Sequence, residues 1–129
     1  MVGLVIISHS KKVAEGAIEI AKQMAPEVKM VAAGGTKDDR IGTDIDIILD
    51  GINEIWNEDG VLVLFDLGSA LMNAEMALEM LDEDKQKNVE LVDAALIEGT
   101  ISAAVSSSIG KSREVIKKEL QELKLNKIN

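Results

Sequence analysis

The chain contains one histidine, His9, and no cysteine. His9 follows an apolar, mostly β-branched run over residues 2–7, which predicts a strand buried inside a parallel sheet. Apolar residues then recur at helical spacing over residues 11–24. His9 is therefore expected between the carboxyl end of a strand and the amino end of a helix. Backbone amides and the helix dipole favour anions such as phosphate at that place.

The surroundings of His9 limit its chemistry. Without cysteine, a second histidine or a nearby carboxylate pair, no metal site is predicted. Proton transfer or covalent catalysis remains, and an imidazole at an anion-favouring turn suits a nucleophile that accepts a phosphoryl group. The flanking hydroxyls of Ser8 and Ser10 are candidate phosphate ligands. The alternative is a hydrogen-bonded loop histidine with no chemistry.

A second polar turn follows another apolar run. Residues 61–65 predict a third strand that ends at Asp66, and a helix is expected over 70–81. Alternating strands and helices predict an α/β fold with a doubly wound, mainly parallel sheet, and in the flavodoxin-like order 2-1-3-4 the first and third strands are neighbours. Asp66 would then hold one ring nitrogen of His9 and leave the other to attack. The alternative for Asp66 is a helix cap or turn residue.

Four further residues of the predicted loops are candidate phosphate ligands: Gly35, Thr43, Gly68 and Ser69. Ordinary turn and capping roles are the alternative for each. Thr43 has Asp46 three residues later, a variant of the capping box, and is expected to cap a second helix that extends to Trp56.

The remaining pattern predicts one domain over residues 1–125 and a frayed tail over 126–129. A second strand is expected over residues 28–33, and Ser112 is expected to cap the last helix. Two further elements are expected: a fourth strand over 89–97, with Asp93 unusual inside it, and a helix of small residues over 101–109.

The predicted helix over 70–81 is apolar on two sides. Because a helix on a sheet buries one stripe, a second stripe formed by Met72, Met76 and Met80 is expected to contact another chain, with a core role as the alternative.

Composition narrows the partners and the location. The chain of 129 residues has a formal net charge of -9, so it is repelled by nucleic acid and by anionic membrane surfaces, and neither is expected as a partner. A protein partner with a basic face is favoured. The lack of cysteine fits a reducing compartment, and the first apolar run is too short for a signal peptide or a membrane span. A cytoplasmic location is expected.

Three segments together resemble the DhaM family, the phosphoryl-donor subunits of bacterial dihydroxyacetone kinase. They are residues 4–10 (LVIISHS), 61–81 (VLVLFDLGSALMNAEMALEML) and 94–105 (AALIEGTISAAV). The loop Gly42-Thr43-Asp44 also matches, and the resemblance covers essentially the whole chain. Relatives of this family are the IIA domains of mannose-type sugar phosphotransferase permeases.

The resemblance implies an EIIA-mannose-like fold and a homodimer. It implies that His9 accepts a phosphoryl group from the phosphocarrier HPr and passes it to ADP on the DhaL subunit, which phosphorylates dihydroxyacetone held by DhaK. No permanently bound cofactor is implied, because the partner subunit holds the nucleotide. Some members carry HPr-like and enzyme I-like domains after this one, and here both are expected to come from separate proteins.

Two other functional classes of protein are also compatible with the sequence. The IIA component of a mannose-type sugar transporter would use the same histidine, but typically has a glycine after it and a Gly-Gly-Ser/Thr-Pro run after the aspartate. This chain has Ser10 and Gly68-Ser69-Ala70-Leu71 at those places. A non-catalytic flavodoxin-like binding module is the third class, and it predicts that His9 is never phosphorylated.

Overall fold

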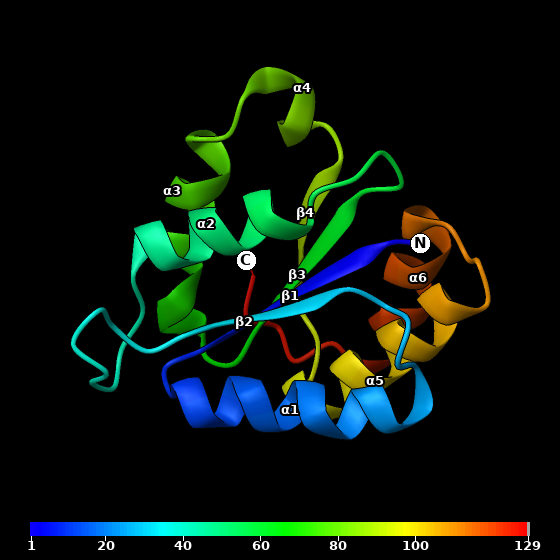
Figure 1. Cartoon of the computed structure of the whole chain (residues 1–129), viewed down its shortest axis with the longest axis horizontal. Helices are drawn as coiled ribbons and strands as arrows, with labels where there is room; N and C mark the ends of the chain where they lie inside the picture. Colours follow the sequence, from blue (N-terminus) through cyan, green and yellow to red (C-terminus); the bar gives the residue numbers. More distant parts are fainter. Residues whose placement is uncertain (129) are drawn as a thin grey trace.

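The computed structural model describes residues 1–128 and is built on a sheet of four strands (Figure 1). The strands are β1 (Gly3–Ser8), β2 (Met30–Gly34), β3 (Val61–Phe65) and β4 (Val89–Val92). Their order is β2-β1-β3-β4, and every neighbouring pair is parallel. The predicted 2-1-3-4 order is confirmed.

The two central strands carry the polar turns of interest. Every residue of β1 and of β3 is buried, because each strand has two neighbours and helices cover both faces of the sheet. The register places Ile7 beside Phe65 and Ser8 beside Gly34. The turns after β1 and β3 therefore start side by side at the carboxyl edge of the sheet.

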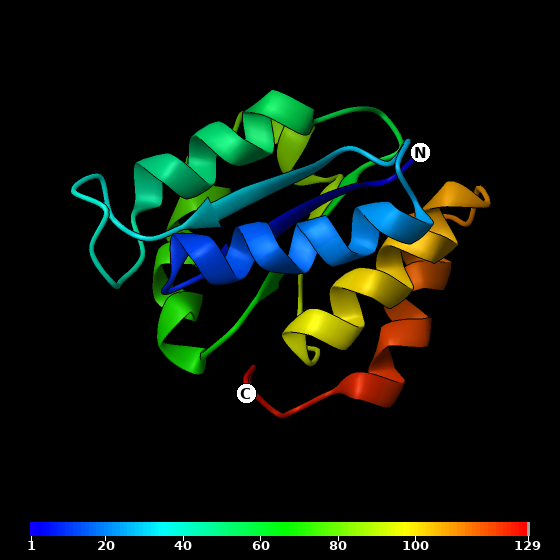
Figure 2. The same ribbon diagram turned by 60° about the horizontal axis from the view of Figure 1, so that its bottom comes forward.

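Helices cover both faces of the sheet. Their bounds are α1 (Lys11–Met24), α2 (Ile45–Ile55), α3 (Leu71–Glu79), α4 (Glu83–Gln86), α5 (Leu96–Ser108) and α6 (Arg113–Glu119), with short 3-10 turns η1 (Gly68–Ala70) and η2 (Leu120–Leu123). Figure 2 shows α1, α5 and α6 on one side of the sheet and α2 on the other. Figure 1 shows α3 beside α2.

Side chains along the central strands alternate between the two faces of the sheet and contribute to two hydrophobic cores. Leu4 and Ile6 of β1 pack toward α1, α5 and α6, whereas Val5 and Ile7 pack toward α2 and α3. Each of these four side chains is fully buried, a change worth about 1.5–3 kcal/mol per side chain. The continuous apolar run of β1 is thus explained by burial on both faces.

The predicted boundaries around the fourth strand were wrong. β4 ends at Val92, Asp93 follows it, and α5 already begins at Leu96 rather than at Ile101. Gly99 lies inside this helix, where a Cβ atom would come within 3.0 Å of Leu64 Cδ2. The small residue allows α5 to begin close against β3.

The predicted cap of the second helix was also wrong. The residue that caps α2 is Asp44, whose Oδ1 accepts a hydrogen bond from the N–H of Ile47 at 3.1 Å. Thr43 lies one residue earlier and accepts a 2.8 Å hydrogen bond from the side-chain amide of Asn73. The predicted cap of α6 is confirmed, since Ser112 Oγ accepts from the N–H of Val115.

The expected fraying of the tail is contradicted over residues 126–128. The carboxylate of Asp93 accepts hydrogen bonds from the backbone N–H groups of Leu125, Lys127 and Ile128. Asp93 is only 8% exposed, so its carboxylate requires such donors, which explains why the tail is docked. Asn129 lies outside the described residues.

The methionines of α3 form an exposed stripe. Met72, Met76 and Met80 expose 71%, 45% and 58% of their surface, so the core alternative is wrong for this chain. The opposite side of α3 buries Ala74 and Ala77 against the sheet.

Over residues 1–128, no helix has both the length and the apolar character needed to span a bilayer.

Two glycine substitutions test how tightly the carboxyl edge is packed. A Cβ atom on Gly34 would lie 2.9 Å from the carbonyl oxygen of Ser10 and 3.0 Å from Lys11 Cα, both backbone atoms, whereas a Cβ on Gly16 in α1 would meet nothing within 4 Å. Gly34→Ala should therefore lower the free energy of unfolding by about 1–3 kcal/mol. The control Gly16→Ala should raise it by about 0.5–1 kcal/mol through helix propensity. Chemical denaturation measures both, and equal effects would contradict the packing described.

Candidate functional site

His9 lies in the turn between β1 and α1, as predicted. Ser10 caps α1, because its Oγ accepts a hydrogen bond from the N–H of Val13 at 3.3 Å. The carbonyl oxygen of His9 accepts a 2.8 Å hydrogen bond from the N–H of Gly42, in the loop after β2. The backbone of His9 is thus held by the start of α1 and by this loop.

The carboxylate of Asp66 organises the turn. Its Oδ2 accepts hydrogen bonds from Ser8 Oγ and from the backbone N–H of His9, both at 2.9 Å. Its Oδ1 accepts from the N–H of Leu67 at 2.7 Å and lies 3.0 Å from His9 Nδ1. The predicted contact between Asp66 and the imidazole across strands β1 and β3 is confirmed in its geometry.

Asp66 is held in its charged form. Partial burial would raise the pKa of this carboxyl, but hydrogen bonds from the backbone and ring of His9, from Ser8 and from Leu67 together lower it below its usual value. Asp66 is therefore an ionised acceptor at neutral pH.

An ionised carboxylate fixes the tautomer of the histidine. Because Asp66 can only accept, His9 Nδ1 must carry the proton of their shared hydrogen bond. In the neutral ring, His9 Nε2 then keeps its lone pair and accepts from the hydroxyl of Ser69 at 2.9 Å. The His9 side chain is 22% exposed, so the ring is not sealed in the core. The arrangement leaves Nε2 as the nucleophilic atom.

The structure brings one predicted phosphate ligand, Ser69, to the reactive side of the ring. Gly68 precedes it and begins the turn η1. Position rather than motif was the signal for Ser69, because residues after β3 must share an edge with His9.

The other candidate ligands make hydrogen bonds that build the site. Ser8 Oγ donates to Asp66 and accepts from the N–H of Ser10, while Ser10 Oγ caps α1. The N–H of Gly35 donates to the carbonyl oxygen of Ser8, and Gly35 adopts a φ of 75°, in the region that favours glycine. Thr43 is tied to α3 through Asn73. A role in phosphate binding stays a prediction for these residues.

A hollow of about 530 Å³ adjoins the turn. Its lining includes the lysines at the start of α1 and part of the loop after β2: Ser10, Lys11, Lys12, Glu15, Asp39, Arg40 and Ile41. Arg40 pairs with Asp38 at 2.8 Å, and Lys11 Nζ lies 4.0 Å from Asp39 Oδ1. Within residues 1–128, no group of three or more histidine, cysteine, aspartate or glutamate side chains could hold a metal ion.

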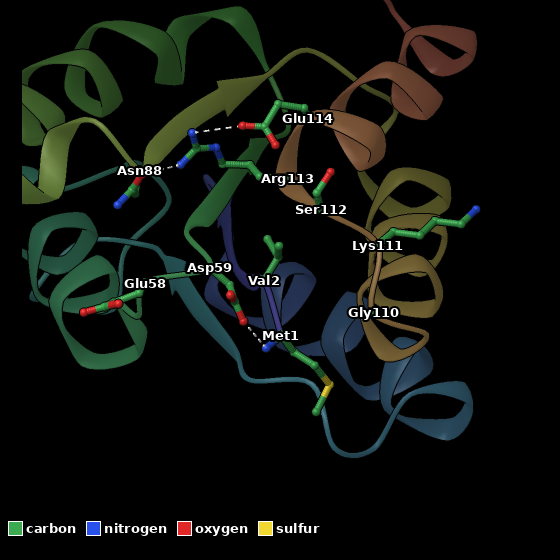
Figure 3. Close-up of a pocket in the computed structure, with 10 residues that line it drawn as sticks. All are labelled: Met1, Val2, Glu58, Asp59, Asn88, Gly110, Lys111, Ser112, Arg113 and Glu114. Atoms are coloured by element: carbon green, nitrogen blue, oxygen red, sulfur yellow. Dashed lines mark hydrogen bonds and ion pairs between the residues drawn. The ribbon is translucent and has the colours of Figure 1, made fainter.

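A second hollow of about 350 Å³ lies at the opposite edge of the sheet, next to the amino ends of β1, β3 and β4 (Figure 3). The N-terminal ammonium group of Met1 pairs there with Asp59 at 2.6 Å, and Glu58 and Glu114 add two more carboxylates. Figure 3 shows Lys111 directed away from the other lining side chains. Arg113 also lines this hollow, but its guanidinium lies 3.2 Å from the Glu90 carboxylate and 3.5 Å from that of Glu114, so the hollow suits an anion less well than the carboxyl edge does.

Lys127 contacts the site, although the sequence did not indicate a role for it. The ammonium group of Lys127 donates to the carbonyl oxygens of Phe65, Asp66 and Ala94. The only signal was indirect: a buried Asp93 needs hydrogen-bond donors, and the polar tail could supply them.

Fold and site together define a parallel α/β domain with a histidine–aspartate pair at the switch point of the sheet. The family model EIIA-man, described as the PTS system fructose IIA component, matches residues 3–117. The chain belongs to this family. The phosphoryl donor subunit DhaM of PEP-dependent dihydroxyacetone kinase 2 from Listeria innocua is 39% identical over 121 residues, which are 93% of this chain and 97% of that protein.

Solved structures agree in fold. The crystal structure of EF1359, a protein of unknown function, superposes with a TM-score of 0.86 at 36% identity, with both chains fully covered. The mannose/sorbose specific IIA subunit of the phosphotransferase system from Enterococcus faecalis gives a TM-score of 0.53 at 17% identity, over 99% of this chain and 92% of that one. This last similarity shows the shared fold alone.

The charge of Asp66 predicts a pH dependence of stability. A carboxyl whose pKa is lowered by folding stabilises the protein above its unfolded pKa, which is about 3.9 for aspartate, and this contribution is lost as the pH falls through the folded pKa. The difference in unfolding free energy between the wild type and Asp66→Asn should therefore be constant near neutral pH and shrink below about pH 4. Denaturation at a series of pH values measures it. A difference that does not change with pH would mean that Asp66 is not held as a carboxylate.

Proposed function

We propose that this chain is a phosphoryl carrier of the phosphoenolpyruvate-dependent phosphotransferase system that serves dihydroxyacetone phosphorylation. His9 Nε2 accepts a phosphoryl group from HPr and passes it to ADP bound on DhaL, which works with DhaK. The observation that carries this proposal is the 3.0 Å contact between His9 Nδ1 and the Asp66 carboxylate, which leaves Nε2 free to attack. Family membership and the name of the Listeria innocua relative support the class of reaction and the acceptor.

The first step exchanges one P–N bond for another. The Nε2 lone pair of His9 attacks the phosphorus of phospho-HPr, and the bond to the HPr histidine breaks with its electron pair returning to HPr. The proton on His9 Nδ1 stays in its hydrogen bond to Asp66. In phosphoryl transfer of this kind, the protein mainly positions the reacting groups and stabilises the charge that develops.

The site can stabilise both charges of the phosphorylated ring. The Asp66 carboxylate lies beside the imidazole, which becomes more positive when Nε2 is phosphorylated. Ser69 Oγ gives up its hydrogen bond to Nε2 when the phosphoryl group arrives and can donate to a phosphoryl oxygen instead. The amino end of α1 follows His9 directly and favours the anion.

In the second step, the phosphoryl group leaves His9 for a different acceptor, ADP. A β-phosphate oxygen of ADP attacks the phosphorus, the P–N bond to His9 breaks, and its electron pair returns to Nε2. ATP forms on the partner subunit, which then phosphorylates dihydroxyacetone. The chain itself needs no permanently bound nucleotide in this scheme.

Phosphate transfer to the purified chain tests the proposal. Incubation with phosphoenolpyruvate, enzyme I and HPr should add one phosphoryl group, seen by intact mass, and His9→Ala should carry none because it lacks the only imidazole. Adding DhaL, DhaK, ADP and dihydroxyacetone should then remove it. Phosphate on the alanine variant would refute the site, and absence of phosphate on the wild type would favour a non-catalytic module. Phosphate that stays on His9 would favour a mannose-type transporter component.

Loss of Asp66 should slow the transfer without unfolding the protein. Asp66→Ala removes the acceptor that holds Nδ1, so phosphate acceptance from HPr should slow by about a hundredfold. Asp66→Asn should be similarly poor or intermediate, because an amide keeps the shape but can select the wrong tautomer. Rapid-quench measurement of the first turnover gives the rate. Rates close to that of the wild type in folded variants would remove Asp66 from the mechanism.

The methionine stripe of α3 is the surface that we propose for partner contact. Met72 lies three residues after Ser69, the residue whose hydroxyl contacts His9 Nε2. Changing Met72 and Met76 to glutamate should leave the fold intact and raise the apparent KM for HPr or DhaL at least about tenfold, because charge is costly in an apolar interface. Met24→Glu, on α1 at 62% exposure, is the matched control. A double variant with unchanged KM but altered sedimentation would assign the stripe to a homodimer, and no change in either would remove it from both roles.

A further inference from the structure

The C-terminal tail returns to the carboxyl edge of the sheet. Asp93, which follows β4, accepts hydrogen bonds from the N–H groups of Leu125 at 3.2 Å, Lys127 at 2.5 Å and Ile128 at 3.1 Å. In addition, the N–H of Ala95 donates to the carbonyl oxygen of Leu123 at 2.9 Å. The tail is therefore fixed in a single path beside the ends of β3 and β4.

This path delivers the ammonium group of Lys127 to three backbone carbonyls. Its Nζ lies 2.5 Å from the oxygen of Phe65, 2.8 Å from that of Ala94 and 3.2 Å from that of Asp66. An ammonium group has three N–H donors, so these contacts use all of them. The same nitrogen lies 4.7 Å from the centre of the Phe65 ring, a cation–π distance.

The contact to Asp66 bears on the reactive histidine. The peptide unit between Asp66 and Leu67 is held on both sides: Lys127 binds its carbonyl oxygen, and the Asp66 carboxylate binds its N–H at 2.7 Å. If this peptide rotates, Oδ1 loses the N–H that fixes it, and Oδ1 is the oxygen that contacts His9 Nδ1. A side chain from the tail thus limits the orientation of the group that sets the histidine tautomer.

We propose that Lys127 is a positioning residue for His9. It fixes the turn after β3 so that Asp66 keeps the proton on Nδ1 and the lone pair on Nε2. It acts through Asp66, and Asp93 presents it by holding the tail. The kinetic part of this inference rests on the proposed phosphoryl transfer, whereas the effect on the tautomer does not.

Removing the ammonium group tests the inference. Lys127→Met keeps an unbranched stem over the Phe65 ring and deletes the three donors, and Lys124→Met is the matched control because Lys124 is an exposed lysine of the same tail. Nitrogen-15 NMR of the neutral His9 ring should show an increased share of the Nε2–H tautomer in Lys127→Met alone. Single-turnover phosphate acceptance from HPr should slow by about tenfold or more, with little change in KM, as expected for misplacement of a reacting group.

A general loss of stability would not produce this combination of effects in a folded variant. Unchanged tautomer and rate in folded Lys127→Met would overturn the inference, and so would an equal effect of Lys124→Met. If Lys127→Met does not fold, Asp93→Asn replaces it, because this variant loosens the tail but keeps the ammonium group. Unchanged tautomer and rate in Asp93→Asn would then overturn the inference. If the wild type accepts no phosphate at all, the proposed function fails, while the tautomer comparison still tests the role of Lys127.

Discussion

Four hydrogen bonds to one carboxylate define the site, and the rest of the chain makes them possible. Asp66 accepts from Ser8, from the backbone and the ring of His9, and from Leu67. These groups come from the ends of β1 and β3, which are neighbours only because the sheet has the order β2-β1-β3-β4. A slip of one residue between the two strands would move every side chain to the other face and separate the pair. The two cores that fix this register therefore also fix the chemistry.

The carboxyl edge needs polar contacts because it must stay open. The proposed phosphoryl transfer requires that another protein reach Nε2, so apolar packing cannot cover it. The turns are held instead by hydrogen bonds from three directions. Gly42 holds the carbonyl oxygen of His9, Asn73 holds Thr43, and Lys127 holds the carbonyl oxygen of Asp66. These contacts restrict the backbone and leave 22% of the imidazole side chain exposed. The backbone of the turn is therefore held in place while the imidazole stays partly exposed.

Much of this arrangement could be predicted from the sequence because it follows from short-range rules. Apolar runs predict buried parallel strands, strand alternation with helices predicts the sheet order, and that order predicts that His9 and Asp66 meet. Two of the failed predictions depended on contacts between distant segments. The tail was expected to fray because it follows the last predicted helix, and its partner Asp93 lies more than thirty residues earlier. Similarly, the start of α5 at Leu96 depends on the fit of Gly99 against Leu64, which composition does not reveal.

In the proposed function, Asp66 keeps a proton on Nδ1 of His9 and leaves Nε2 for the phosphoryl group. Long-range proton–nitrogen NMR correlation on the nitrogen-15-labelled, phosphorylated protein distinguishes the two ring nitrogens directly. We expect phosphorus on Nε2 and a retained proton on Nδ1, hydrogen-bonded to Asp66. Phosphorus on Nδ1 would contradict it, because that nitrogen could no longer donate to the carboxylate.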